Sequence, residues 1–225
     1  MNRKTMITGL LAISVTFGGM ACSSPPPAAP AKPAAPAAPA KPKPTSTKPA
    51  PAPSKPPEQP KKEIPAATKV AVPADWDTYW DSEKGYQFEV PTGTKAEWVT
   101  VEGVDWFEGT TPSNVQVNVA AYKDKSASKE DLLALAKQFC LQDGDTDVVI
   151  GEAKELSGDY SLAEGSGTLK DGKKYKMKIL VATDVTDNYI VILWTDVDKY
   201  DANKDIIDGI WGSFSMYSGG FTGES

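Results

Sequence analysis

Apolar and polar residues alternate along several stretches of the second half of the chain, which is the pattern of half-buried β-strands. Segments 86–90 and 115–121 show the alternation most clearly, and the first of them stops at a proline. Segment 189–194 is apolar throughout, so we expect a central strand that is covered on both faces. Further strands are expected at 98–101, 147–156, 160–170 and 175–181, with turns at Asp171-Gly172 and Asp187-Asn188.

Two stretches have helical spacing instead. In the first, Ser128 and Asp131 predict a capped N-terminus and Gly144 predicts the end of the helix. Its apolar residues fall at i, i+3, i+4, i+7 and i+8, namely Leu132, Leu135, Ala136, Phe139 and Cys140. A second helix is expected over about 199–211, where one stripe holds Tyr200, Ile207, Ile210 and Trp211. Hairpins combined with two helices predict an α+β fold, an antiparallel β-sheet with helices packed on it.

The opening Tyr-x-Phe-x-Val-Pro of 86–91, the single helix in the middle and the closing Ile-Trp-Gly-Ser-Phe of 210–214 resemble the PsbP/Mog1-like domain. The resemblance covers about residues 75–217. It implies binding or assembly roles, and it supplies no catalytic residue that can be placed on this chain. Small bacterial surface lipoproteins are among the proteins in which this fold occurs.

Proline divides the chain, because 16 of its 19 prolines fall between Pro25 and Pro65. Proline fixes φ and restricts the residue before it, so neither helix nor strand is expected in that part. With almost no large apolar residue, nothing there offsets the entropy of folding. We therefore expect a Pro/Ala/Lys-rich disordered tether over 22–69 and an acidic globular domain over 70–225.

The first 21 residues have the order of a secretory signal peptide. Arg3 and Lys4 precede a mostly apolar stretch over 6–17. The sequence Gly19-Met20-Ala21-Cys22 resembles the lipobox of bacterial lipoproteins, which makes Cys22 the expected lipid attachment site, although Gly19 stands where leucine is usual. Cleavage after Ala21 by an ordinary signal peptidase is the alternative, and it would release a soluble protein.

A lipoprotein signal places the protein in the cell envelope, held to a membrane by several acyl chains. By family analogy, Ser23 after the cysteine favours the outer membrane where the cell has one. The expected partners are therefore the membrane, through the anchor, and an envelope protein or cell-wall component.

The globular domain is strongly acidic, with 14 lysines against 28 acidic residues over 70–225. It has no arginine, so binding to nucleic acid is not expected. The chain has no histidine, which excludes Ser-His-Asp and Cys-His nucleophile systems. We expect no enzyme activity, no cofactor and no metal site.

Two acidic clusters are candidates for cation binding. Asp143, Asp145 and Asp147 have the spacing that opens a calcium loop, but Val148 and Lys154 occupy the positions that need glycine and glutamate. A polar turn after a helix is the favoured interpretation. Asp201, Asp205 and Asp208 would share one helical face, for which a solvated surface is favoured over cation or partner docking.

Four other features have both a structural and a functional interpretation. Cys140 closes an apolar helical stripe, so core packing is favoured over reactivity. The residues Trp76, Tyr79 and Trp80 are expected to pack rather than to stack on a sugar or lipid, and Gly165-Ser-Gly167 lies in a hairpin, where it cannot hold a phosphate. Solvent-facing strand protection is favoured over partner orientation for the lysines of one hairpin, Lys170, Lys173, Lys174, Lys176 and Lys178.

These observations favour a lipid-anchored, non-enzymatic binding or interaction module. The alternative is a carrier or sensor of a small apolar or sugar ligand held between sheet and helix, in a pocket that would involve Trp106 or Trp194. A hydrolase with paired carboxylates is the third hypothesis, although no pair is singled out by its spacing.

Overall fold

In the computed structural model the described residues are 47–49 (backbone only), 61–65, 71–101, 103–122, 126–184 and 187–217. All of them belong to one unit, Pro44–Ser225. Within these residues, antiparallel pairs build two sheets. The larger has nine strands, in the order β1 (Thr47–Pro49), β5 (Lys95–Val101), β6 (Val104–Thr110), β7 (Gln116–Tyr122), β12 (Asn188–Asp196), β11 (Lys174–Thr183), β10 (Tyr160–Thr168) and β8 (Thr146–Ile150), while β9 (Lys154–Ser157) pairs with β10.

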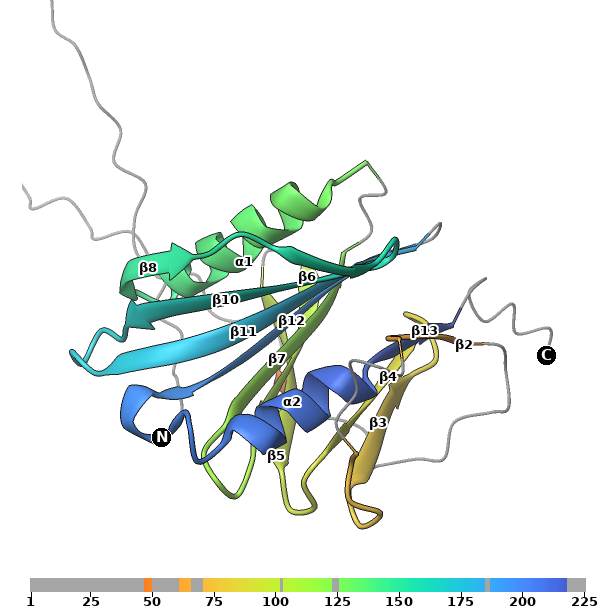
Figure 1. Ribbon diagram of the computed structural model, residues 1–225, viewed down its shortest axis with the longest axis horizontal. Helices are drawn as coiled ribbons and strands as arrows, with labels where there is room; N and C mark the ends of the chain where they lie inside the picture. Colours follow the sequence, from red (N-terminus) through yellow and green to blue (C-terminus); the bar gives the residue numbers. More distant parts are fainter. Residues whose placement is uncertain are drawn as a thin grey trace, which may run out of the picture. The chain divides into compact units, whose positions relative to one another are not determined.

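The smaller sheet has four strands, in the order β2 (Lys61–Glu63), β13 (Ser215–Tyr217), β4 (Tyr86–Val90) and β3 (Asp77–Asp81). Helix α1 (Lys129–Gln142) packs on one face of the larger sheet, against β8, β11 and β12. Helix α2 (Lys204–Ser213) lies on the opposite face with the smaller sheet, and a 3-10 turn, η2 (Val197–Lys199), precedes it (Figure 1).

Successive residues of the central strands enter two different cores, because both faces of the larger sheet are covered. Strand β12 is buried at every position except its last. Its Val191 and Leu193 face α2 and the smaller sheet, whereas Ile190 and Ile192 face α1. The predicted central strand is therefore confirmed. The α+β architecture, an antiparallel sheet with helices packed on it, is confirmed as well.

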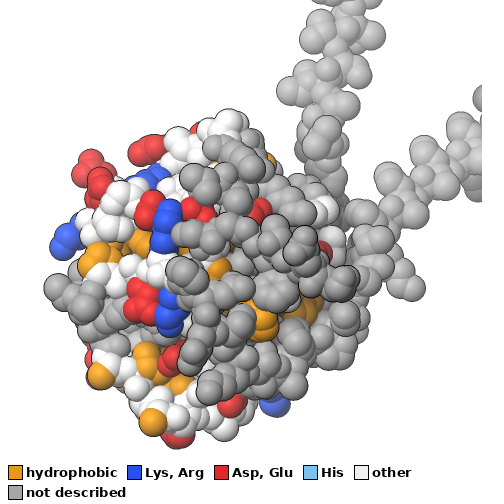
Figure 2. Space-filling model, turned by 90° about the vertical axis from the view of Figure 1, so that its right-hand side faces the viewer, with side chains coloured by type: hydrophobic (Ala, Val, Ile, Leu, Met, Phe, Trp, Pro, Cys, Tyr) orange, Lys and Arg blue, Asp and Glu red, His pale blue; other side chains and the backbone are white. Residues whose placement is uncertain are grey.

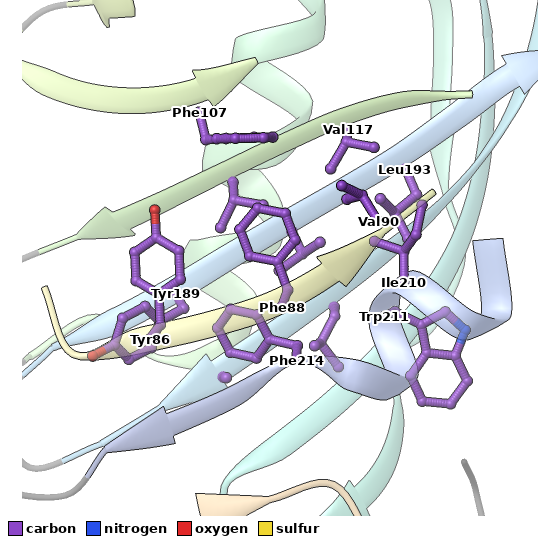
Figure 3. Close-up of a cluster of buried hydrophobic side chains, with 14 of the residues drawn as sticks. Tyr86, Phe88, Val90, Phe107, Val117, Tyr189, Leu193, Ile210, Trp211 and Phe214 are labelled. Atoms are coloured by element: carbon purple, nitrogen blue, oxygen red, sulfur yellow. The ribbon is translucent and has the colours of Figure 1, made fainter. Parts of the chain in front are cut away.

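Aromatic rings dominate the core between the two sheets (Figure 3). Phe88 of β4 meets Phe107 of β6 edge to face, with ring centroids 4.9 Å apart. Phe214, the residue after α2, stacks on Tyr86 of β4 at 5.9 Å. Offset and edge-on ring pairs of this kind add to the stabilisation from burial alone.

The first helix begins where the sequence predicts. The Ser128 hydroxyl accepts a hydrogen bond from the Asp131 backbone N–H, and the Asp131 carboxylate accepts one from the Ser128 N–H. Gly144 follows the helix with a φ of +88°, a conformation that glycine adopts readily. Helix α2, however, begins at Lys204 instead of near 199, because the chain first makes the 3-10 turn.

Two strands lie in the proline-rich segment, where neither helix nor strand was expected. The proline-rich segment contributes β1, which pairs with the edge of β5, and β2, which pairs with the edge of β13. Each meets an open sheet edge whose backbone groups need partners. Ile64, next to β2, is 1% exposed and supplies the apolar burial that its neighbours lack.

Candidate functional site

Helix α1 covers only part of its sheet face. Strands β5, β6 and β7 lie beside the helix and are not covered by it. An apolar groove of about 170 Å³ lies along this flank, and we call it the α1 groove. Its helix side is one stripe at i, i+3, i+4 and i+7, made of Leu135, Gln138, Phe139 and Gln142. Its sheet side is made of Val101, Val104, Trp106, Ala120, Tyr122 and Ile190.

The sheet register explains the shape of the α1 groove. Trp106 of β6 lies opposite Ala120 of β7, and Ala120 lies opposite Ile190 of β12. The small side chain of Ala120 thus lies between the large side chains of Trp106 and Ile190. The space that Ala120 leaves between them can accommodate an inserted group.

One wall of the α1 groove is an aromatic stack. The ring of Trp106 lies on that of Phe139 with a centroid separation of 4.1 Å and an interplanar angle of 21°. Both residues are buried. Because rings packed in this way have few alternative rotamers, the wall is formed before any ligand arrives.

The polar groups of the α1 groove are neutral. Gln138 is exposed and Gln142 half-buried, and each amide can both donate and accept a hydrogen bond. Tyr122 supplies a hydroxyl on the sheet side. The lining therefore offers an apolar surface with hydrogen-bonding groups at its rim, which is the composition of a binding site.

Two carboxylates lie on the same sheet face, one row away from Trp106. Glu97 of β5 is directly opposite Glu108 of β6, and Glu108 is two residues from Trp106 on the same strand. Like charges placed opposite each other across a sheet are destabilising. Both carboxylates therefore lie on the sheet face that carries the α1 groove.

The wider surface is mixed in charge. On the face drawn in Figure 2, acidic and basic side chains lie interspersed. The lysines predicted to face solvent do so at Lys170, Lys173, Lys174 and Lys176. Lys176 lies over the ring of Tyr200, with its ammonium 5.2 Å from the centroid.

The prediction for Lys178 is wrong. This residue is 6% exposed, because α2 covers that face of β11. Its ammonium donates to the Asp208 carboxylate, which also accepts from Lys204 at 2.5 Å and from the indole N–H of Trp211 at 2.9 Å. The solvated face predicted for Asp208 is therefore also wrong, since Asp208 is 5% exposed and α2 begins after Asp201.

Two opposing effects act on the pKa of Asp208. Burial favours the neutral acid and would raise the pKa, but the hydrogen bonds from Lys178, Lys204 and Trp211 outweigh it, and the pKa is lowered. The carboxylate is therefore charged at neutral pH. It joins β11 to α2 as a structural ion pair.

The first acidic cluster is divided among three environments. Asp143 caps the end of α1, Asp145 is buried, and Asp147 lies in β8 with a φ of +53°. Burial raises the pKa of Tyr175, and the neighbouring Cys140 and Asp145 raise it further. Among the residues that the structure describes, no group of three or more His, Cys, Asp or Glu side chains could hold a metal ion.

Most of the remaining candidates pack as the sequence predicts, whereas Trp80 is half-buried. Cys140 of α1 is buried between the helix and the sheet. Tyr79 is buried, and Trp76 lies so close to Gly209 of α2 that a Cβ there would come within 2.8 Å of its ring. A Cβ at Gly167 would come within 2.4 Å of the Tyr175 hydroxyl, so this glycine makes room for the tyrosine.

The α1 groove was only partly foreseen. Trp106 lines it, as the small-ligand hypothesis expected, whereas Trp194 packs against Tyr175 with ring centroids 5.3 Å apart. Cys22, the expected lipid attachment site, lies outside the described residues. No helix among the residues described is both long and apolar enough to cross a membrane.

No protein-family model matches the chain, and no curated protein sequence does. Among solved structures, the chain is similar to the solution structure of cyanobacterial PsbP (CyanoP) from Synechocystis sp. PCC 6803, with a TM-score of 0.50 and 23% sequence identity. The similarity covers 66% of this chain and 95% of that chain. The domain therefore has a PsbP-like fold, as the sequence predicted, and at this identity the comparison bears on the fold alone.

Proposed function

We propose that this protein is a lipid-anchored cell-envelope protein whose acidic domain is a non-enzymatic binding module, and that the α1 groove receives an apolar side chain of a protein partner. The observation that carries the proposal is the preformed Trp106–Phe139 wall beside an apolar floor. Buried aromatic anchors beside a small cavity are the usual centre of a protein interface.

The size of the α1 groove favours an inserted side chain over a separate small molecule. Pockets that enclose drug-sized ligands have volumes of about 300–1,000 Å³. The groove has about 170 Å³, which suits one large apolar side chain. The carrier hypothesis would need a larger or more enclosed space.

Charge indicates what surrounds that side chain in the partner. Glu97 and Glu108 lie beside the α1 groove, and the domain as a whole is acidic. A partner segment with lysine or arginine near the apolar residue would complement the acidic charge of the domain. We therefore expect a basic segment with one apolar anchor.

The lipid anchor rests on the sequence of residues 19–22, and its test is independent of the α1 groove. Intact-mass analysis of the mature chain from native membranes should give the mass of a chain that begins at Cys22 plus its acyl groups. A Cys22→Ser variant should move to the aqueous fraction. An unmodified mass for the native chain would contradict the anchor.

Photocrosslinking tests the α1 groove in the cell envelope. A benzophenone side chain in place of Gln138, on the rim of the groove, should crosslink to another polypeptide. The matched control replaces Lys137, which is also exposed but does not line the groove. Equal crosslinking at the two positions would contradict the proposed binding site.

The carrier hypothesis has one observation in its favour, the presence of Trp106 in a space between helix and sheet. Native mass spectrometry of the domain purified from its own cells distinguishes the two hypotheses. A small molecule that stays bound to the wild-type protein, and is lost from a Val104→Asp variant, would favour the carrier. We expect the unliganded mass.

A further inference from the structure

The short strand β2 is held at the edge of the smaller sheet by contacts of three kinds. The first is backbone pairing, in which Lys61, Lys62 and Glu63 lie opposite Tyr217, Met216 and Ser215 of β13. The other edge of β13 is already paired with β4. Strand β2 therefore adds itself to an open sheet edge, as peptide ligands do in β-augmentation.

The second contact is an acidic pocket for the side chain of Lys62. Its ammonium lies 2.8 Å from the Asp184 carboxylate and 3.6 Å from that of Asp159. The Asp184 side chain is 0% exposed. Because a buried carboxylate is costly without a cation, this pocket specifies a basic residue at the position of Lys62.

The third contact holds the residues around Lys62. The Tyr160 hydroxyl donates to the Lys62 carbonyl at 2.7 Å, which fixes the backbone of the strand. Ile64, two residues on, is 1% exposed and belongs to the core between the sheets. Lys61, by contrast, is exposed and pairs with Glu63 of its own strand at 2.7 Å.

From these contacts we infer a second binding site, separate from the α1 groove, at which the β13 edge, Asp159, Asp184, Tyr160 and the apolar pocket of Ile64 recognise an extended peptide of the pattern Lys-x-aliphatic. Residues 62–64 occupy this site in cis. A partner segment with the same pattern can replace them, because the contacts that hold the strand come from the backbone of β13, the side chains of Asp159, Asp184 and Tyr160, and the core around Ile64.

The inference does not depend on the α1 groove or on the lipid anchor. The cis segment is a small part of the fold, and local opening of so few contacts needs much less free energy than global unfolding. Its release would expose the β13 edge for another strand. The site would thus bind a partner only when the protein's own N-terminal segment leaves it.

The test uses the full mature chain with Lys62→Ala and Ile64→Ala, and a fluorescent peptide of residues 58–66. Fluorescence anisotropy should show binding to this variant and none to the wild-type chain, whose site is filled. A peptide carrying Lys62→Glu should bind at least about tenfold more weakly, because it loses a charge-assisted hydrogen bond. The matched peptide carrying Lys61→Glu should bind within about threefold of the unchanged peptide, because the Lys61–Glu63 pair that it loses is exposed.

Each other outcome overturns the inference. A folded variant that does not bind the peptide would make the cis segment an ordinary edge strand, and so would equal binding of the Lys62→Glu and Lys61→Glu peptides. If the variant loses its near-UV circular dichroism, the free peptide should restore the signal. Failure to restore it would show that the segment cannot be exchanged.

Discussion

The indole ring of Trp106 stacks on the phenyl ring of Phe139 with their centroids 4.1 Å apart. This contact joins β6 to α1, and the two rings have little exposed surface. It fixes one side of α1 against the neighbouring strand β6. The wall of the α1 groove is thus a product of core packing.

Truncation of Phe139 should therefore affect both stability and the α1 groove. We expect Phe139→Ala to lower the free energy of unfolding by about 3–5 kcal/mol, the usual cost of removing a buried ring. The emission of Trp106 should shift to the red as water reaches the indole. Urea unfolding and fluorescence measure the two effects. Leu141→Ala in the same helix is the control, since Leu141 is 48% exposed and a change there should stay within about 0.5 kcal/mol.

Removing one partner of the Lys178–Asp208 pair should greatly lower the free energy of unfolding. Asp208→Ala should cost about 3–5 kcal/mol, because Lys178 would stay buried with only the exposed Glu164 carboxylate, 3.9 Å away, as a partner. Replacing both residues, as in Lys178→Met with Asp208→Leu, should cost less than Asp208→Ala alone. Asp205→Ala, exposed in the same helix, serves as the control for denaturant unfolding. Equal losses for Asp205 and Asp208 would contradict the pair.

The same carboxylate predicts a dependence of stability on pH. The pKa of Asp208 is lowered in the folded protein, so its contribution is complete above the unfolded-state pKa of about 3.9. That contribution is lost as the pH falls through the lowered pKa. The difference in unfolding free energy between the wild type and Asp208→Asn should therefore be constant from pH 7 to about 5 and shrink below about 4. A difference that grew on acidification would have the wrong sign.

Replacing Gly209 by alanine should change the free energy of unfolding in the direction opposite to the usual one. Glycine to alanine usually stabilises a helix by about 1 kcal/mol. Here the new Cβ would lie 2.8 Å from the Trp76 ring, so Gly209→Ala should instead cost about 1–3 kcal/mol. Adding Trp76→Leu should remove that clash. Gly158→Ala, where nothing lies within 4 Å, is the neutral control.

Strongly periodic segments of the sequence predicted their elements well. The capping residues of α1, the alternation of β7 and the apolar run of β12 all appear in the structure. Strand β6 was not predicted, because its buried Trp106 and Phe107 are adjacent and face different cores. Such a strand shows no simple alternation in its sequence.

Long-range pairing explains the remaining differences. The alternating pattern of its strand predicts a surface position for Lys178. Its partner Asp208 lies thirty residues away on α2, so the sequence pattern does not reveal the pair. Strand β2 could not be predicted for a similar reason, because its contacts come from Asp184, Tyr160 and β13, which are distant in the sequence. The α1 groove needs both the helix stripe and the row from Trp106 to Ile190, which only the fold brings together.

Quantitative affinity capture tests the proposed binding module most directly. The wild-type domain, a Val104→Asp variant and a Val197→Asp variant would be immobilised and exposed to the same extract of native envelopes. Val104 lines the α1 groove, whereas Val197 is an exposed apolar residue on η2. We expect the wild type and Val197→Asp to retain at least one basic envelope protein, and Val104→Asp to retain at least about tenfold less of it. The same set of proteins on all three would contradict it.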